Sequence, residues 1–187
     1  MLVVTSNMSK YELRARAHNL SGVSYDQSLL VTTALSPPIL QRIGGIDGVK
    51  QLSTNFYDRV FADTNEPWFL GIFASSTKAE AIDNQYRFLV QTFNGPELYK
   101  AKKGKYTRLV GRHANFRIGL AAAKRWIIHM DGAIDDHEAL RVKENDITRE
   151  YLKYYFSYTA YYIVVASEYL RDDQLSGGQQ MDTGQNW

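Results

Sequence analysis

Residues 111–134 read GRHANFRIGLAAAKRWIIHMDGAI, and this stretch decides how the chain is interpreted. Its first part, as far as Gly119, shows no regular hydrophobic spacing and contains one histidine, His113. In its second part, hydrophobic side chains recur every three or four residues: Leu120, Ala123, Trp126, Ile127, Met130 and Ile134. That spacing places them on one face of an α-helix. The stretch therefore predicts a helix preceded by an irregular segment that carries a histidine.

The same helical spacing is found on both sides of this stretch. It covers residues 46–60, 81–92 and 147–170. Gly44-Gly45 permits a tight corner before the first of these helices, and Asn94-Gly95-Pro96 ends the second. Residues 68–73 are apolar but short, which favours a buried corner, and residues 97–118 predict a loop with one short helix. No segment has the pattern of a strand, so the predicted fold class is all-α.

A pair of prolines and a change in composition divide the chain into one domain with an extension at each end. Pro37-Pro38 separates a mixed, weakly periodic N-terminal extension, residues 1–36, from the helical domain, residues 37–172. Residues 173–187 are polar and rich in glycine, which predicts a disordered tail. Composition leaves three alternatives for the extension: it covers the domain, it forms the interface of a homodimer, or it is disordered.

The composition excludes several classes of function. Of the 187 residues, 22 are Lys or Arg and 20 are Asp or Glu, and this near-balance offers no basic face for nucleic acid. The absence of cysteine excludes disulfides, thiolate zinc sites and thiol catalysis. No stretch approaches the ~20 apolar residues of a membrane span, and the N-terminus lacks the core of a signal peptide. The expected location is therefore cytoplasmic.

The chain also lacks the motifs of hydrolytic and nucleotide chemistry. It has no His-Glu-x-x-His, no Gly-x-Ser-x-Gly and no phosphate-binding loop. Asp135-Asp136 stands beside His137 at a polar helix end, where solvated side chains are expected rather than an acid–base pair. His129 and His137 are both predicted to lie at the surface.

His113 has neighbours that suit a haem. Taken alone, a histidine is most often a surface residue or a satisfied buried one. Here, however, the predicted helices supply aromatic side chains and few polar ones: Tyr57, Phe61, Phe73, Gln85, Phe88 and Trp126. A neutral imidazole gives haem iron its fifth bond, apolar walls exclude water, and donors on the opposite side govern a diatomic ligand. Gln85 is the most informative of them, because an amide on an apolar face needs a buried partner.

The candidate residues form an ordered set of motifs: Phe56-Tyr57, Phe73, Gln85, Phe88, Gly95-Pro96, Tyr99, Arg112-His113, Phe116 and Trp126. This set, within residues 43–170, resembles the truncated, two-over-two haemoglobins of the second group, and most closely their plant and algal members. Asn94 stands where those proteins usually have glycine, which Asn tolerates because it also adopts positive φ. The resemblance implies a two-over-two helical sandwich around haem b, with an N-terminal extension.

The resemblance implies roles on the two sides of the haem iron. His113 would be the proximal ligand. Tyr57, Trp126 and Gln85 would be the polar groups on the distal side. Ala81 would leave the sixth iron position without a nearby side-chain ligand.

It also implies which residues contact the rest of the haem. Phe73, Phe88 and Phe116 would pack against the ring. Arg112 and Tyr99 would face its propionates, because guanidinium and phenol groups suit carboxylates.

The function implied is reversible binding of dioxygen, nitric oxide or carbon monoxide. Three polar distal groups would hold dioxygen tightly and release it slowly, which argues against bulk oxygen transport. Slow release favours redox chemistry such as nitric oxide dioxygenation, with a reductase as partner. The alternative is a haem-free helical interaction module that retains the globin fold and docks through its extension or its tyrosine-rich last helix.

Overall fold

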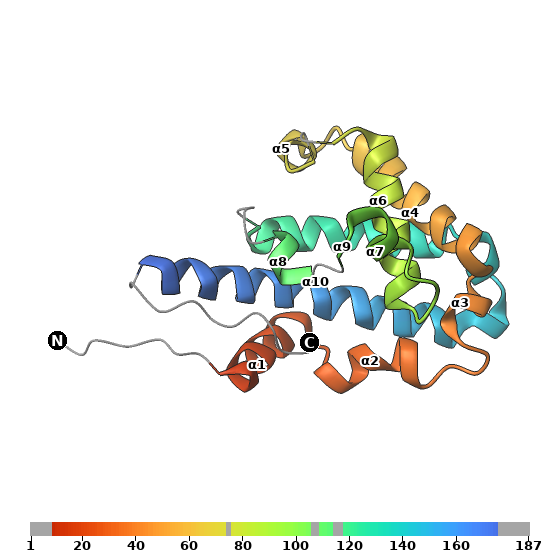
Figure 1. The fold of residues 1–187 in the computed structure, drawn as a ribbon, viewed down its shortest axis with the longest axis horizontal. Helices are drawn as coiled ribbons and strands as arrows, with labels where there is room; N and C mark the ends of the chain where they lie inside the picture. The colour runs from red at the N-terminus through yellow and green to blue at the C-terminus, as the bar shows by residue number, and fades with distance from the viewer. Residues whose placement is uncertain (1–8, 74–75, 106–108, 114–117, 176–187) are drawn as a thin grey trace.

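In the computed structural model, residues 9–73, 76–105, 109–113 and 118–175 are described, and all regular structure in them is helical (Figure 1). The helices are α1 (Lys10–Ser21), α2 (Tyr25–Thr33), α3 (Ile39–Arg42), α4 (Gly45–Phe61), α5 (Pro67–Gly71), α6 (Lys78–Thr92), α7 (Leu98–Lys103), α8 (Leu109–His113), α9 (Leu120–Asp135) and α10 (Asp146–Leu175). Two short 3₁₀ turns, Glu138–Leu140 and Lys143–Asn145, join α9 to α10. The predicted all-α class is confirmed.

Two pairs of helices form the core. α4 packs against α6, α9 packs against α10, and contact between α4 and α9 joins the two pairs (Figure 1). The facing sides bury large hydrophobic side chains: Leu52, Phe56, Val60, Leu89, Met130, Ile134 and Leu152. Most of these residues occupy positions that the helical spacing predicts as apolar. Their removal from water is what holds the four helices together.

The N-terminal extension folds into α1 and α2, which lie along α10 (Figure 1). Leu13 of α1 is 3% exposed and packs with Val165 and Tyr169 of α10. Ala17 of α1 and Val23, between the two helices, pack with Tyr158 and neighbouring tyrosines. Residues 10–33 therefore cover the helical domain, which is the first of the three alternatives. Residues 176–187 of the predicted tail lie outside the described residues.

Three helices begin with a capping box, in which a hydroxyl accepts from the backbone three residues on and that residue's side chain accepts in return. The pairs are Ser9 with Glu12 at α1, Ser24 with Gln27 at α2, and Thr77 with Glu80 at α6. Each box satisfies backbone N–H groups that a helix start leaves unpaired. The extension thus has its own local signals for forming helices.

Two corners of the domain adopt left-handed backbone. Gly44 and Gly45, at the start of α4, have φ of 92° and 72°, which glycine adopts without steric cost. Asn94, after α6, has a φ of 61°. The prediction that Asn replaces glycine there through its tolerance of positive φ is confirmed.

The prediction that His129 and His137 lie at the surface is wrong. His137 is fully buried, and its Nε2–H donates to the Gly48 carbonyl at 2.8 Å. Burial lowers the pKa of His137, so its ring is neutral at pH 7. His129 is 7% exposed, and its Nε2 lies 2.8 Å from the Asp63 carboxylate. The His137 ring faces α4 and the His129 ring faces the corner after it, and the sequence next to each histidine does not indicate these partners.

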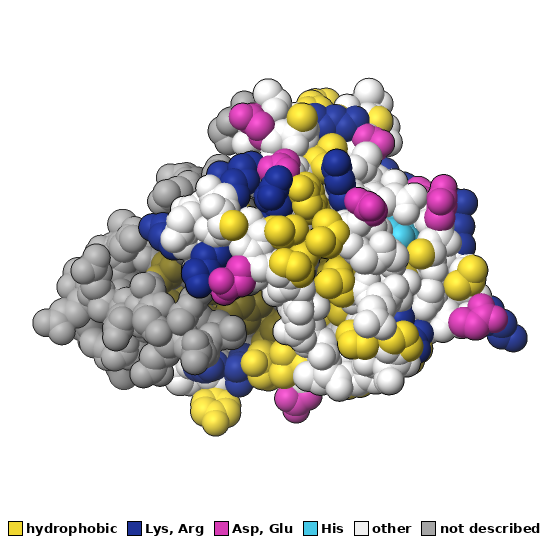
Figure 2. Space-filling model, turned by 45° about the vertical axis from the view of Figure 1, so that its right-hand side comes forward, with side chains coloured by type: hydrophobic (Ala, Val, Ile, Leu, Met, Phe, Trp, Pro, Cys, Tyr) yellow, Lys and Arg dark blue, Asp and Glu magenta, His cyan; other side chains and the backbone are white. Residues whose placement is uncertain are grey.

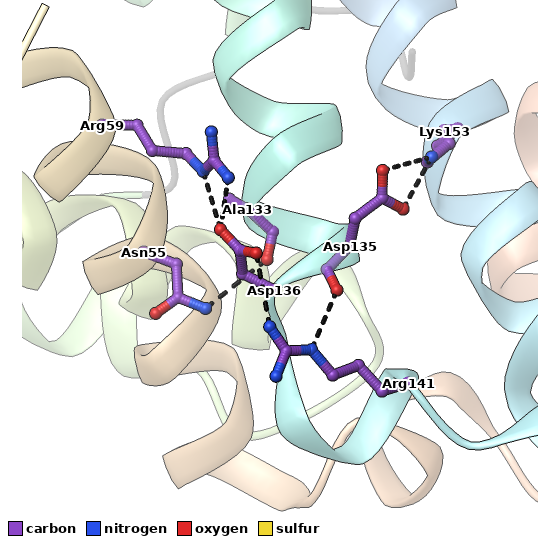
Figure 3. A network of polar contacts seen from close by, with 7 residues as sticks. All are labelled: Asn55, Arg59, Ala133, Asp135, Asp136, Arg141 and Lys153. Atoms are coloured by element: carbon purple, nitrogen blue, oxygen red, sulfur yellow. Dashed lines mark hydrogen bonds and ion pairs between the residues drawn. The ribbon is translucent and has the colours of Figure 1, made fainter.

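The polar end of α9 is solvated, as predicted. Asp135 and Asp136 are exposed and make ion pairs with surface side chains (Figure 3). Lys153 donates to Asp135 at 2.8 Å, and Arg59 donates to Asp136 through Nε at 3.0 Å. Exposed pairs of this kind contribute little to stability. Their role is to hold the end of α9 beside α4 and α10.

On the face shown in Figure 2, hydrophobic side chains gather near the centre, with Lys and Arg side chains beside them. Among the residues that the structure describes, none of the helices has the length and apolar character needed to cross a membrane.

Candidate functional site

A cavity of about 280 Å³ lies between α4, α6, α8, α9 and α10. Seven of the predicted site residues line it: Tyr57, Phe73, Ala81, Gln85, Phe88, His113 and Trp126. They come from segments that are far apart in the sequence. The structure therefore brings together, in one enclosed space, residues that the sequence selected separately.

His113 ends the short helix α8 and is half-buried at this cavity. Its Nδ1 lies 2.7 Å from the carbonyl oxygen of Leu109, one helical turn earlier. A carbonyl only accepts, so Nδ1 carries the proton and donates. This hydrogen bond leaves the lone pair on Nε2, the arrangement in which histidine binds a metal. The bond also fixes the orientation of the ring.

Tyr57 and Trp126 enter the cavity from α4 and α9. Phe56 lies between them, with ring centroids 4.9 Å from Tyr57 and 5.0 Å from Trp126. Phe73 packs edge-on against Tyr57 at 5.8 Å. These ring contacts limit the orientations that the phenol and the indole can adopt. The phenol O–H and the indole N–H thus belong to rings with restricted orientation, Tyr57 buried and Trp126 partly buried.

Gln85 is the polar residue that α6 contributes to the predicted site. Its Oε1 atom is buried and has no hydrogen-bond partner within the described part of the chain. Leaving a buried carbonyl oxygen unpaired costs about 1–3 kcal/mol. Native proteins keep such atoms chiefly where function needs them. Ala81, one turn before Gln85, is 7% exposed and adds only a methyl group to the wall.

The residues predicted to contact the rest of the haem divide into three groups. Phe73 and Phe88 line the cavity. Tyr99 is buried but does not line it, since its ring packs edge-on against Phe88 at 5.6 Å. Arg112 lies in α8, but its side chain is outside the described part of the structure, and Phe116 lies outside it altogether.

Sequence reasoning missed the wall that α10 provides. Five residues on one face of this helix line the cavity: Tyr155, Phe156, Thr159, Ala160 and Ile163. The spacing of three and four residues predicts a helix, but it does not indicate which part of the helix faces a cavity. A usable signal was the change from tyrosine to the smaller Thr159 and Ala160, which leaves room beside the helix.

The donor set of the cavity fits a haem. No carboxylate, lysine or arginine is among the described residues that line it. The described residues also contain no group of three or more His, Cys, Asp and Glu that would hold a bare metal ion. A single imidazole in an apolar pocket suits a metal that brings its own equatorial ligands, as haem iron does. Gln85 belongs to the wall of the same cavity, and its buried Oε1 has no hydrogen-bond partner among the described residues.

Known proteins share both the sequence and the arrangement of helices. A family model described as bacterial-like globin matches residues 39–159. The chain is 37% identical to two-on-two hemoglobin-3 of Arabidopsis thaliana over 156 residues, which cover 83% of each protein. It is 43% identical to group 2 truncated hemoglobin 3-1 of Lotus japonicus over 124 residues, 66% of this chain and 70% of that one.

Among solved structures, the thermostable hemoglobin of the actinobacterium Thermobifida fusca is 29% identical, with a TM-score of 0.58. The similarity covers 67% of this chain and 95% of that one. The segment that matches the family model contains every residue of the cavity wall except Ala160 and Ile163.

Proposed function

Because the chain belongs to the bacterial-like globin family, among the truncated haemoglobins of the second group, we propose that it binds haem b in this cavity and holds dioxygen there with slow release. The family supports binding of diatomic ligands at a haem in general. The observation that carries the proposal for this chain is the single cavity that joins His113 to Tyr57, Gln85 and Trp126.

Haem iron supplies the reversible bond to the diatomic ligand. His113 holds the group through Nε2, with its ring oriented by the Leu109 carbonyl. The aromatic walls keep water away and so strengthen every polar contact inside. Arg112, Tyr99 and Phe116 are proposed to contact the edge of the same group, as the resemblance implies.

Three polar groups on the distal side slow the departure of the ligand. Tyr57 has a phenolic O–H, Trp126 has an indole N–H, and Gln85 has an amide that both donates and accepts. Each hydrogen bond contributes ~1 kcal/mol, and ~1.4 kcal/mol corresponds to a factor of ten, so three bonds slow release about a hundredfold. Ala81 offers no side chain that competes for the ligand's position.

Slow release suits redox chemistry and not bulk transport of oxygen. The proposed reaction is dioxygenation of nitric oxide to nitrate, for which a reductase partner returns the electron that the reaction consumes. The competing function is a haem-free interaction module, which needs the fold but not the cavity.

An absorption spectrum of the purified protein, with haem supplied, tests the proposal. We expect a strong Soret band that is lost or greatly weakened in His113→Ala. His18→Ala is the matched control, because His18 is exposed on α1 and its loss leaves the cavity unchanged. A folded wild-type protein that stays colourless supports the interaction module instead. A Soret band of equal strength in His113→Ala contradicts the assignment of His113.

A further inference from the structure

A second cavity adjoins the first and lies between the N-terminal extension and the globin domain. It has a volume of about 280 Å³, and its walls come from α1, α2, α6, α8 and α10. Four residues line both cavities: Phe88, Leu109, Tyr155 and Thr159. The extension therefore does more than cover α10, because it encloses a space of its own beside the candidate haem site.

Tyr158 lines this second cavity, and its hydroxyl is buried. The residue is 5% exposed, and its Oη atom has no hydrogen-bond partner among the described residues. Burial raises its pKa, so the phenol stays protonated at neutral pH. A protonated phenol without a partner is a donor that needs an acceptor.

Arg14 places a positive charge in the same wall. Its guanidinium stacks on the Tyr25 ring, 3.5 Å from the centroid, and the Tyr25 ring lies 6.0 Å from that of Tyr158. Burial raises the pKa of Tyr162 to about 12, and the Arg14 charge acts in the opposite direction on Tyr162 and on Tyr158. Arg14, Tyr158 and Tyr162 thus line the same cavity, and the charge of Arg14 acts on both phenols.

Among the residues that the structure describes, no carboxylate balances the charge of Arg14. No carboxylate is among the described residues that line the cavity, and Arg14 makes no ion pair within the described part of the chain. The remaining walls are aromatic and aliphatic, with Leu29, Leu109 and Val110 among them. A cation and a phenolic donor at one place, with apolar walls around them, are complementary to an anionic group on an apolar body.

We propose that this cavity, which we call the extension cavity, binds a small carboxylate with an apolar chain. The carboxylate accepts from the Arg14 guanidinium and the Tyr158 hydroxyl, and the chain lies against the apolar wall. The volume is near the lower end of the ~300–1,000 Å³ that small-molecule sites occupy, which suits a short chain and not a long lipid.

Titration of the full-length, haem-loaded protein with octanoate tests the proposal. The ferrous carbon monoxide form is used, because its distal site is already occupied and the Soret band reports any entry into the first cavity. We expect saturable calorimetric binding at one site without displacement of carbon monoxide. Arg14→Gln weakens that binding about tenfold or more, because a charge-assisted contact is lost.

Two further variants separate recognition from folding. Tyr158→Phe is expected to weaken octanoate binding severalfold while leaving the free protein as stable as before, or more stable, because the hydroxyl removed has no partner. Arg16→Gln is the matched control on α1, since Arg16 does not line the cavity and pairs with Glu168 instead. It should bind octanoate like the wild type.

Octanol, which has the same chain without the carboxylate, is expected to bind at least about tenfold more weakly than octanoate. Equal affinity for octanol and octanoate, or equal affinity of Arg14→Gln and the wild type, overturns the proposal. Absence of saturable binding also overturns it, since the cavity then holds only water. If the protein takes up no haem, the same variants are compared as apoprotein. Failure of haem binding in the first cavity can then be distinguished from failure of carboxylate binding in the extension cavity.

Discussion

At the scale of single residues, the candidate site combines rigid aromatic groups with polar atoms in an apolar space. Tyr57 and Trp126 are held by ring contacts with Phe56, whereas Gln85 keeps a buried oxygen that has no partner among the described residues. An apolar core would be more stable without that oxygen. A ligand that completes the hydrogen bonding of Gln85 would explain why this oxygen is present. The lower stability of the free protein would then be a consequence of ligand binding.

The double variant Tyr57→Phe with Trp126→Leu removes the two proposed distal donors and leaves apolar side chains in their places. We expect dioxygen to leave about tenfold faster or more, because each lost bond contributes ~1 kcal/mol or somewhat more in a dry site. Stopped-flow displacement of dioxygen by carbon monoxide measures the rate. The control is Tyr11→Phe with Trp68→Leu, whose side chains are 81% and 47% exposed. An unchanged release rate contradicts the distal roles of Tyr57 and Trp126.

At the scale of helices, a buried ionic cluster ties α9 to the corner between α4 and α5. The Asp63 side chain is 2% exposed, accepts from Arg125 Nε at 2.7 Å, and lies 2.8 Å from His129 Nε2. The His129 ring stacks on Phe69 at 5.5 Å, and Phe69 lines the candidate haem cavity. Arg125 and His129 lie on α9, the helix that carries Trp126 into the cavity, so we expect the cluster to affect how the indole is placed.

The Arg125 guanidinium, and then His129, hold the pKa of the Asp63 carboxyl well below its usual range. Asp63→Asn removes the charge while keeping the shape, so we expect a clearly lower midpoint of thermal unfolding at pH 7 and faster ligand release. A carboxyl with a lowered folded pKa stabilises above its unfolded pKa of ~3.9 and loses that contribution as the pH falls below it. The difference between wild type and variant should therefore shrink below about pH 4.

Thermal unfolding followed by circular dichroism between pH 7 and pH 3 measures this effect. Asp58→Asn, on α4 just before this corner, is the control, because Asp58 is about half exposed and pairs with Lys78 at the surface. If Asp63→Asn and Asp58→Asn lower the midpoint equally, the buried cluster does not hold α9 in place.

At the scale of the whole molecule, the N-terminal extension is part of the folded unit. α1 and α2 bury one side of α10, and the family model matches only from residue 39 onward. The extension thus adds a layer to the segment that the family model matches, and its Val31 joins the main hydrophobic core. This layer also encloses the extension cavity.

Leu13→Ala tests whether that layer is stably packed. Leu13 is 3% exposed against Val165 and Tyr169, so its truncation should cost about 2–5 kcal/mol of unfolding free energy. Leu20→Ala on the same helix is the control, because Leu20 is 40% exposed and should change stability by no more than about 0.5 kcal/mol. Urea denaturation measures both. Equal effects of the two variants contradict the packing of α1 on α10, and the Soret band should survive in each.

The main helices were predictable because hydrophobic spacing is a property of neighbouring residues. The spacing in 46–60, 81–92, 120–134 and 147–170 corresponds to α4, α6, α9 and α10. The positive φ of Asn94 was equally a local matter. The burial of His137 could not be predicted in this way. Its neighbours Asp135 and Asp136 indicate an exposed helix end, whereas the ring is buried against α4, which is distant in the sequence.

By itself, then, the sequence determined which segments are helices, and through its resemblance to a family it selected His113, Tyr57, Gln85 and Trp126. Only the tertiary structure decided that these four share a cavity, that α10 forms one of its walls, and that Asp63 meets His129. The physical reason is that helix formation depends on contacts within a few residues, whereas a cavity depends on which helical faces meet. Arg14 and Tyr158 illustrate the difference, since neither suggests a site until the extension folds against α10.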